Sequence, residues 1–179
     1  MKRLGAIFLL GTLSLSLLTG CGDKTGYAED GYAEGRLGDT MHTYFFDYTV
    51  NSAYLCDTFE GYTPILDGYR LLVADVTVKN TNRESIPMYD TDFQVQWSDT
   101  SEDAYEFPIT YYTDAVSDQQ LPTEYDLAVD EERTGLLVFE VPEGETDFSI
   151  SYLELFDDGT EEGSSGDTFF VYFTAEEQA

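Results

Sequence analysis

The sequence predicts an all-β fold, an antiparallel two-sheet sandwich that follows an N-terminal signal peptide. Three observations support this fold class. Apolar side chains recur at every second position in several short runs, which is the period of a strand with one buried face. No window keeps the 3.6-residue period of an amphipathic helix. The 179 residues include 14 Tyr and 12 Phe, a content typical of a folded core and not of a disordered chain.

Residues 1–20 are predicted to be a lipoprotein signal peptide. Lys2 and Arg3 give a cationic start, and the 15-residue segment Leu4–Leu18 has no charged side chain. As a helix this segment would extend roughly 22 Å, which is shorter than the hydrocarbon core of about 30 Å that a spanning helix crosses. A charged start, a short apolar middle and small residues at the end are typical of a cleaved export signal.

The end of this segment, Leu18-Thr19-Gly20-Cys21, resembles the lipobox of bacterial lipoproteins. The resemblance implies that diacylglycerol is attached to the Cys21 thiol and that cleavage after Gly20 makes Cys21 the first residue. A thiolate is nucleophilic enough near neutral pH to accept the lipid, and two acyl chains anchor a protein stably where one does not. We therefore expect a lipid-anchored protein at the extracytoplasmic face of the cell membrane. An ordinary cleaved signal with an incidental cysteine is the alternative.

Residues 21–35 are predicted to be a flexible acidic tether. They are rich in glycine and acidic residues, contain a near-repeat of Gly-Tyr-Ala-Glu, and show no core-forming period. A flexible chain of this length spans roughly 20 Å. The folded domain is accordingly expected at 36–179.

Six runs of alternating residues within 36–179 are predicted to be strands. In each run the apolar members fall on one face and their polar neighbours on the other. Turn-forming residues follow at 80–82, 142–144 and 157–167. Strands with a single apolar face must pack these faces together, and two sheets do so. The apolar members are Phe46, Tyr48 and Val50; Leu72, Ala74, Val76 and Val78; Phe93, Val95 and Trp97; Leu137, Phe139 and Val141; Phe148, Ile150 and Tyr152; and Phe169, Val171 and Phe173.

Three blocks of the sequence carry a family resemblance: LGDTMHTYFFDYTVNSAYL at 37–55, YRLLVADVTVKNTN at 69–82 and LAVDEERTGLLVFEVPEG at 127–144. They resemble bacterial secreted lipoprotein domains of unknown function of the four-three-five-two type. The resemblance implies an immunoglobulin-like (telokin-like) sandwich that is secreted or lipid-anchored and acts as a binding module. It supplies no catalytic residues. One departure from the family pattern is Val129-Asp130, where Pro-Gly is common.

The acidic net charge of the chain excludes nucleic acid as an expected partner and argues against docking on anionic lipid. The chain carries 8 basic and 36 acidic residues, a net charge of −28, and loss of Lys2 and Arg3 with the signal peptide brings it to −30. Phosphate backbones need clustered Lys and Arg, so no nucleic-acid partner is expected. Anionic lipid should repel the folded body. Contact with the membrane is therefore expected through the Cys21 lipid.

Motifs for catalysis and cofactor binding are absent from the sequence. No nucleophile elbow, HExxH, CxxC or phosphate-binding glycine loop occurs, so no enzyme activity and no cofactor are expected. His42 is predicted to be a surface residue and Cys56 a small buried hydrophobe, and whether the two meet is open. The acidic loop 157–167 has oxygen ligands that suit calcium but lacks the EF-hand spacing, so no metal ligand is assigned.

Tyr105, Tyr111 and Tyr112 are the predicted partner-binding residues. They lie between strand-like runs in a segment that Pro108 interrupts, and tyrosines with one wet side often mark interaction surfaces. An edge strand whose rings pack on the core is the alternative. The predicted function is a lipid-anchored binding module with a protein or glycan partner. Two alternatives stay open: a glycan hydrolase of the cell envelope that uses two carboxylates, and a calcium-stabilised structural module of the envelope.

Overall fold

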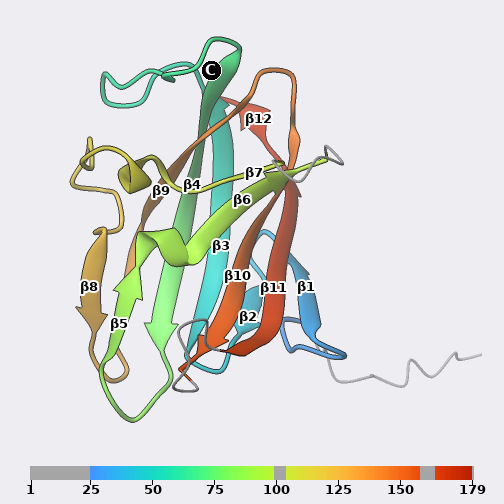
Figure 1. The fold of residues 1–179 in the computed structure, drawn as a ribbon, viewed down its shortest axis with the longest axis vertical. Helices are drawn as coiled ribbons and strands as arrows, with labels where there is room; N and C mark the ends of the chain where they lie inside the picture. The colour runs from blue at the N-terminus through green and yellow to red at the C-terminus, as the bar shows by residue number, and fades with distance from the viewer. Residues whose placement is uncertain (1–24, 99–103, 158–163, 179) are drawn as a thin grey trace, which may run out of the picture.

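The computed structural model of the chain describes residues 25–98, 104–157 and 164–178. Within these ranges the regular elements are strands, apart from two short 3-10 helices (Figure 1). The all-β class predicted from the alternating runs is confirmed, and the strands form two packed sheets with a small third sheet beside them. No helix in the described ranges is long and apolar enough to cross a membrane.

The front sheet, so called because it lies in front of the other in Figure 1, has the strand order β1-β11-β10-β6-β7. Its neighbours are antiparallel except for β1, which runs parallel to β11. The strands of this sheet are β1 (Tyr32–Arg36), β6 (Phe93–Trp97), β7 (Tyr105–Glu106), β10 (Asp147–Phe156) and β11 (Ser164–Thr174).

The back sheet has the order β12-β3-β4-β9, and β2 pairs with β3 off this path. Its neighbours are antiparallel except for β12, which runs parallel to β3. Its strands are β2 (Thr40–His42), β3 (Phe46–Cys56), β4 (Tyr69–Asn80), β9 (Glu132–Pro142) and β12 (Glu176–Glu177). The small third sheet and the helices are β5 (Ile86–Tyr89), β8 (Glu124–Leu127), η1 (Asp90–Asp92) and η2 (Ile109–Tyr111).

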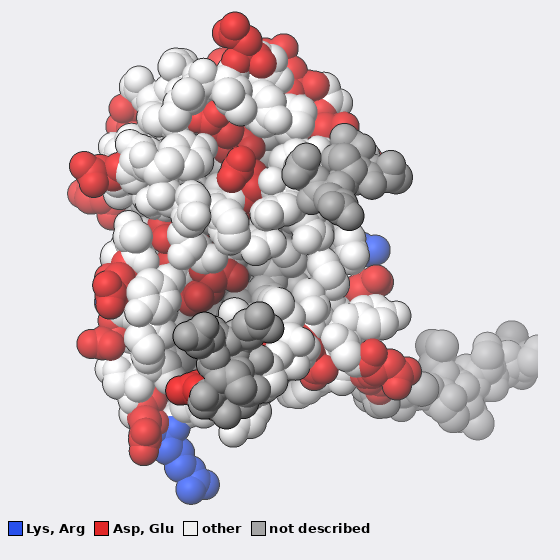
Figure 2. All heavy atoms as spheres, viewed as in Figure 1, with Lys and Arg blue, Asp and Glu red and all other residues white. Residues whose placement is uncertain are grey.

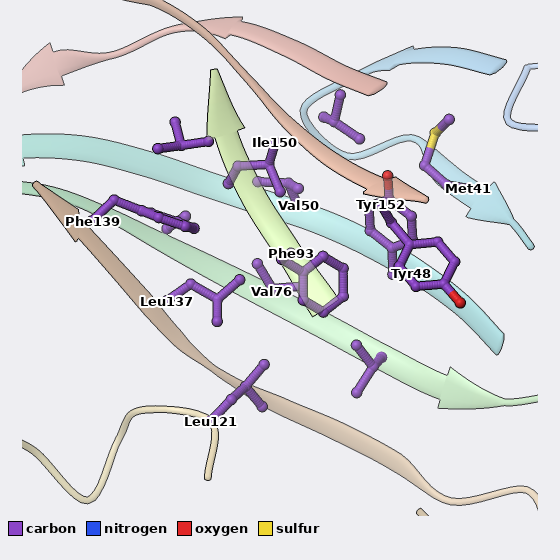
Figure 3. Close-up of a cluster of buried hydrophobic side chains, with 14 of the residues drawn as sticks. Met41, Tyr48, Val50, Val76, Phe93, Leu121, Leu137, Phe139, Ile150 and Tyr152 are labelled. Atoms are coloured by element: carbon purple, nitrogen blue, oxygen red, sulfur yellow. The ribbon is translucent and has the colours of Figure 1, made fainter. Parts of the chain in front are cut away.

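The core lies between the front and back sheets and consists of the side chains that the alternation predicts to be buried. Every apolar member of the six predicted runs is buried except Trp97, which is half-buried. Aromatic rings fill the middle of the core, among them those of Tyr48, Phe93 and Tyr152 (Figure 3). The ring centroids of Tyr48 and Phe93 are 5.3 Å apart, and those of Phe46 and Tyr152 are 4.7 Å apart. Burial of one such side chain stabilises the fold by about 1.5–3 kcal/mol, so this ring layer holds the two sheets together.

A β-bulge changes the face that β3 turns to the core. The register of β3 with β4 shifts between Val50 and Ser52, which leaves Asn51 as the extra residue. The Asn51 amide donates a hydrogen bond to Asp75 Oδ1 at 2.6 Å. Because one extra residue moves all following side chains to the other face, Leu55 is buried where uninterrupted alternation would have placed it outside.

A second apolar cluster covers part of the outer face of the back sheet. Leu71, Val73 and Val138 point away from the main core, yet they are buried. Phe59 from the loop after β3 and Ile109 from η2 pack on them. Two connecting segments thus belong to the folded body because they shield outward apolar residues from water.

The predicted flexible tether, 21–35, is wrong for residues 25–35, which are part of the sandwich. β1 pairs with β11 over its whole length, and Ala33 is buried in the core. Composition did not indicate this strand because only Ala33 and Gly35 point inward, too few apolar side chains to mark it. The other residues of the predicted tether lie outside the described ranges.

The departure from the family pattern at Val129-Asp130 is compatible with the turn. Asp130 adopts a φ of 59° just before β9, a left-handed conformation that glycine prefers. Aspartate tolerates this region better than most residues. The turn therefore forms with Asp130 in the position where glycine is common.

We predict that removal of β1 destabilises the domain. A chain that begins at Leu37 loses the pairing with β11, and a few backbone hydrogen bonds at about 1 kcal/mol each amount to roughly 2–4 kcal/mol. For a domain of this size the melting temperature should fall by roughly 5–15 °C. Thermal unfolding followed by circular dichroism measures the shift.

A chain that begins at Thr25 is the matched control, because it keeps β1 and loses only residues outside the described ranges. Its melting temperature should equal that of the chain that begins at position 21 and carries Cys21→Ser. Equal melting temperatures for the chains that begin at Thr25 and at Leu37 would contradict the role given to β1.

Candidate functional site

The outer face of the front sheet carries a trough that runs along β10. Ser149 and Ser151 form its floor because they alternate with Phe148, Ile150 and Tyr152, which point into the core. Both serines face outward and are nevertheless buried. Their side chains are short, and the side chains of the neighbouring strands rise beside them.

The strand register decides which side chains form the walls. Each serine pairs on one side with a glutamine of β6 and on the other with an aromatic residue of β11. Directly paired residues project to the same face with Cβ atoms about 4.5–5.5 Å apart. One wall therefore consists of amides and the other of rings. The six residues of this trough are Gln94, Gln96, Ser149, Ser151, Phe170 and Tyr172.

The aromatic wall is braced by β1. The rings of Phe170 and Tyr172 stack with centroids 5.8 Å apart and planes 19° apart. Arg36 pairs with Tyr172 across β1 and β11, and its guanidinium carbon lies 5.3 Å from the centre of the Tyr172 ring, a cation–π contact. Burial raises the pKa of the Tyr172 hydroxyl, so this hydroxyl is protonated and available as a hydrogen-bond donor.

Two hollows lie along the trough. The first, of about 450 Å³, is lined by Gln96, Trp97 and Tyr172 among others, and the second, of about 360 Å³, by Gln94, Ser151 and Phe107. Both volumes lie in the range of small-ligand sites. Figure 2 looks onto this face, where uncharged side chains (white) and acidic ones (red) both appear and the Lys and Arg side chains (blue) lie at the margin.

The charged groups that line the two hollows already have interactions of their own. Asp147 accepts a hydrogen bond from the Thr174 hydroxyl at 2.6 Å, and Asp92 accepts the backbone N–H of Tyr89 at 2.9 Å. Arg36 is engaged with the aromatic wall. The six trough residues are all uncharged, in a chain whose net charge is −28.

Two of the three tyrosines predicted to bind a partner extend this trough. Tyr105 pairs with Gln96 across β6 and β7, and Tyr111 stacks on Phe107 with centroids 5.1 Å apart. Tyr105 is 44% exposed and Tyr111 66% exposed. The Phe107 ring also meets Tyr105 edge-on at 6.0 Å and lines the second hollow. The binding role of these tyrosines stays a prediction, but the fold places both beside a recess.

Tyr112, the third predicted tyrosine, belongs to a different cluster. It is hydrogen-bonded to Tyr62, whose hydroxyl donates to Oε1 of the buried Glu140 at 2.7 Å. The N–H of Ile65 donates to the same oxygen at 2.9 Å. Burial first, and then the Glu140 charge, raise the pKa of Tyr112. These bonds attach the loop between β3 and β4 to the back sheet, which is a structural task.

The predicted anchor and the predicted acidic loop lie largely outside the described residues. Gly20 and Cys21, the cleavage and lipid-attachment residues, are not described, and neither are residues 158–163 of the loop 157–167. Among the residues that the structure describes, no three His, Cys, Asp or Glu side chains gather as a metal-ion site.

His42 and Cys56 do not meet. His42 pairs with Asp47 across β2 and β3, and its Nδ1 lies 3.0 Å from Asp47 Oδ1. Cys56 is at the far end of β3, about 30 Å from Asp47 on an extended strand. Burial raises the pKa of the Cys56 thiol, which disfavours the nucleophilic thiolate. Cys56 is half-buried and packs against the second apolar cluster.

Among the described residues, Asp90 and Asp92 are the carboxylates to consider for the alternative function, a glycan hydrolase of the envelope, because the pKa of each is raised. Burial raises the pKa of both side chains, and that of Asp92 reaches about 6. They lie two positions apart in the single turn η1, whereas glycoside hydrolysis requires carboxylates that face each other across a bound sugar. Asp90 is buried and accepts a hydrogen bond from the Thr110 hydroxyl, while Asp92 accepts the N–H of Tyr89.

Comparison with known proteins gives a family and a fold. The family model described as "Domain of unknown function (DUF4352)" matches residues 35–161. Among curated proteins none is similar enough to count as a match.

Solved structures with the same fold come from several bacteria. A protein of Bacillus subtilis, ycdA, described as a "putative lipoprotein", is 15% identical with a TM-score of 0.56; the match covers 76% of this chain and 38% of that one. The yjhA protein of Bacillus subtilis is 21% identical with a TM-score of 0.55, over 76% of this chain and 97% of that one. MPT63, a secreted protein of Mycobacterium tuberculosis, is 14% identical with a TM-score of 0.55, over 80% and 98%.

We predict that Asp92 makes the stability of the domain depend on pH. Its pKa in the folded state, about 6, lies above the ordinary value of 3.8. The folded state therefore holds the proton more tightly, so the free energy of unfolding falls as the pH rises from about 4 to about 6 and then levels. Asp92→Asn keeps an oxygen for the Tyr89 N–H and removes the charge, so at pH 7.5 it should be more stable than the parent by about 1–3 kcal/mol.

Urea unfolding of both proteins at pH 4, 5, 6 and 7.5 measures this difference. The exposed Asp126→Asn on β8 is the matched control and should follow the parent at every pH. A constant difference between Asp92→Asn and the parent from pH 4 to 7.5 would contradict the burial of the Asp92 charge.

Proposed function

This chain belongs to the DUF4352 family, as its three sequence blocks predicted, and we propose that it is a lipid-anchored binding module of the extracytoplasmic cell envelope. The trough on the outer face of the front sheet is the proposed binding surface. The proposed mechanism is presentation: the lipid on Cys21 fixes the location, and the rigid sandwich holds the trough open toward a ligand.

The observation that carries the binding role is the trough itself. Its rings and amides lie on three strands whose inward side chains are locked in the core, so the surface is preorganised and costs little entropy to present. Recessed sites with mostly apolar and aromatic walls and a few polar groups are the usual form of ligand sites.

The lipid anchor is supported by the sequence and by the descriptions of two structural relatives. The motif Leu18-Thr19-Gly20-Cys21 follows a charged start and a short apolar segment, in the order that a lipoprotein signal requires. Of the structurally similar proteins, ycdA is described as a "putative lipoprotein" and MPT63 as a secreted protein. Both descriptions agree with export of this chain.

The early start of the fold supports a position of the proposed module close to the membrane. Since the His42 N–H donates to the Gly26 carbonyl at 2.8 Å, the chain is attached to the sandwich at Gly26, which follows Cys21 by only five positions in the sequence. A spacer this short reaches roughly 10 Å, about half the distance that a fourteen-residue tether would give. Within about a Debye length of 8 Å, anionic lipid repels the acidic surface of the protein. This repulsion should keep the outer faces of the front and back sheets away from the bilayer.

Binding without catalysis is the form of the function that we propose. Among the described residues, the two carboxylates with raised pKa values share one turn and are engaged by Thr110 and Tyr89. His42 of β2 pairs with Asp47 at the start of β3, whereas Cys56 is at the end of β3. Neither arrangement supplies a nucleophile next to its base or a facing acid pair.

We predict that Cys21→Ser releases the protein from the membrane. Serine cannot take the place of the thiol in lipid attachment, so the variant should move from the membrane pellet to the soluble or secreted fraction. Fractionation of cells that express the full chain measures the change. Cys56→Ser is the matched control and should fractionate with the parent; a Cys21→Ser variant that stays in the membrane pellet would contradict the anchor.

We also predict that the module binds the cell envelope through the trough. The soluble mature chain, residues 21–179 with Cys21→Ser, should sediment with isolated envelopes. Ser151→Phe fills the floor of the trough and should reduce the bound fraction at least about tenfold, because a filled recess excludes its ligand. Absence of sedimentation, or sedimentation that Ser151→Phe leaves unchanged, would overturn the proposed binding surface.

A further inference from the structure

We propose that the ligand of the trough is an uncharged glycan chain that lies along β10. This inference rests on the proposed binding function and specifies the chemistry of the ligand. It follows from three features of the trough: the neutrality of its residues, the pairing of amides with rings, and its extension along the strand.

The neutrality of the trough selects against charged ligands. A site for a cation would place carboxylates on its floor, yet the floor consists of Ser149 and Ser151. The two carboxylates that line the hollows, Asp147 and Asp92, already accept hydrogen bonds from the Thr174 hydroxyl and the Tyr89 N–H. A site for an anion such as a phosphate polymer would need several Lys or Arg. The one arginine at the trough, Arg36, lies at its edge over the Tyr172 ring and also donates to the Gly35 carbonyl at 3.0 Å.

The walls match the two kinds of surface on a sugar ring. A pyranose has flat faces of C–H groups, which pack on aromatic rings because the ring face is negative and the C–H hydrogens are positive. It also has hydroxyls around its edge, each a donor and an acceptor. The amides of Gln94 and Gln96 offer donors and an acceptor each, and the serine hydroxyls offer both roles. Phe170 and Tyr172 provide the rings directly across the floor.

An apolar ligand and an extended peptide fit this trough less well. An apolar ligand would bury the Gln and Ser side chains without hydrogen-bond partners, which is unfavourable. An extended peptide recognised by backbone pairing adds to the free edge of a sheet, whereas the trough lies on the face of β10, which is paired on both sides.

The length of the trough favours a chain over a single sugar. Its two hollows lie toward opposite ends of the outward row Ser149, Ser151 and Leu153, which extends about 13 Å along the strand. Tyr105, Phe107 and Tyr111 continue the aromatic surface at the side of β7. A chain of several rings could therefore contact aromatic side chains on both sides of the glutamine wall.

The test uses the soluble mature chain with Cys21→Ser and the single tryptophan as reporter. Trp97 is the only tryptophan of the chain and lines the first hollow, so an occupied trough should change its fluorescence. The probes are soluble neutral polysaccharides (a β-glucan, an α-glucan, a xylan and a mannan) and chitohexaose. Dextran sulfate is the anionic comparison. Migration in native gels that contain each polymer gives an independent measure.

We expect at least one neutral probe to retard the protein and to shift the Trp97 fluorescence. Tyr172→Ala should weaken binding of this probe about tenfold, since a few anchoring aromatic residues carry most of the binding free energy of an interface. Ser151→Phe should abolish binding because it fills the floor. Tyr69→Ala, a half-buried tyrosine on β4 of the back sheet, is the matched control and should bind as the parent does. Thermal unfolding confirms that each variant is folded.

Failure of the glycan assignment is distinguishable from failure of the binding function. If no neutral probe binds, or if dextran sulfate binds more tightly than all of them, the ligand is not a neutral glycan. Binding that Tyr172→Ala and Ser151→Phe leave unchanged also overturns the assignment. The binding function is tested separately by sedimentation with envelopes. If Ser151→Phe reduces that sedimentation in any of these cases, the trough is still a binding surface, and its ligand has a different chemistry.

Discussion

The aromatic layer between the two sheets is the interaction on which the rest of the structure depends. Phe46, Tyr48, Phe93 and Tyr152 meet with centroids between 4.7 and 6.4 Å apart. Because side chains alternate along a strand, burial of these rings also decides which residues point outward. The serines of β10 and the glutamines of β6 face the outer side of the front sheet for this reason. The proposed binding surface is therefore a consequence of the core.

The two sheets use their outer faces differently. On the back sheet the outward residues Leu71, Val73 and Val138 are apolar, and loop residues cover them. On the front sheet the corresponding positions of β10 hold Ser149 and Ser151, which need no apolar cover and leave a recess. One face thus adds stability through a second small core, and the other remains a preorganised surface of rings and amides.

Sequence patterns predicted the main strands well because each long strand has one continuous apolar face. β1 could not be predicted in this way, since its partner β11 is more than a hundred residues away and its inward residues are only Ala33 and Gly35. The sequence does not predict the β3 bulge at Asn51 either, because a bulge depends on the pairing register and not on residue type alone. Because β1 carries so few inward apolar residues, the predicted start of the domain at position 36 is too late.

The candidate site was predictable only in part. The aromatic segment of Tyr105 and Tyr111 was identified from its composition, and both residues lie beside the trough. Tyr112 could not be separated from them, because its attachment to Tyr62 and Glu140 joins segments far apart in sequence. The trough itself was missed. Alternation shows that Ser149 and Ser151 face outward, but only the register of three strands shows that glutamines and rings stand beside them.

The central claim, that the outer face of the front sheet is the ligand surface, is tested most directly by chemical-shift mapping. The soluble mature chain, labelled with ¹⁵N and ¹³C, is titrated with neutral glycans isolated from the envelope, and backbone and glutamine side-chain amides are followed. The account predicts shifts concentrated in β6, β10 and β11, with the Gln94 and Gln96 side chains among the largest. Shifts concentrated on the back sheet or on the loop between β3 and β4, with the trough unchanged, would contradict it.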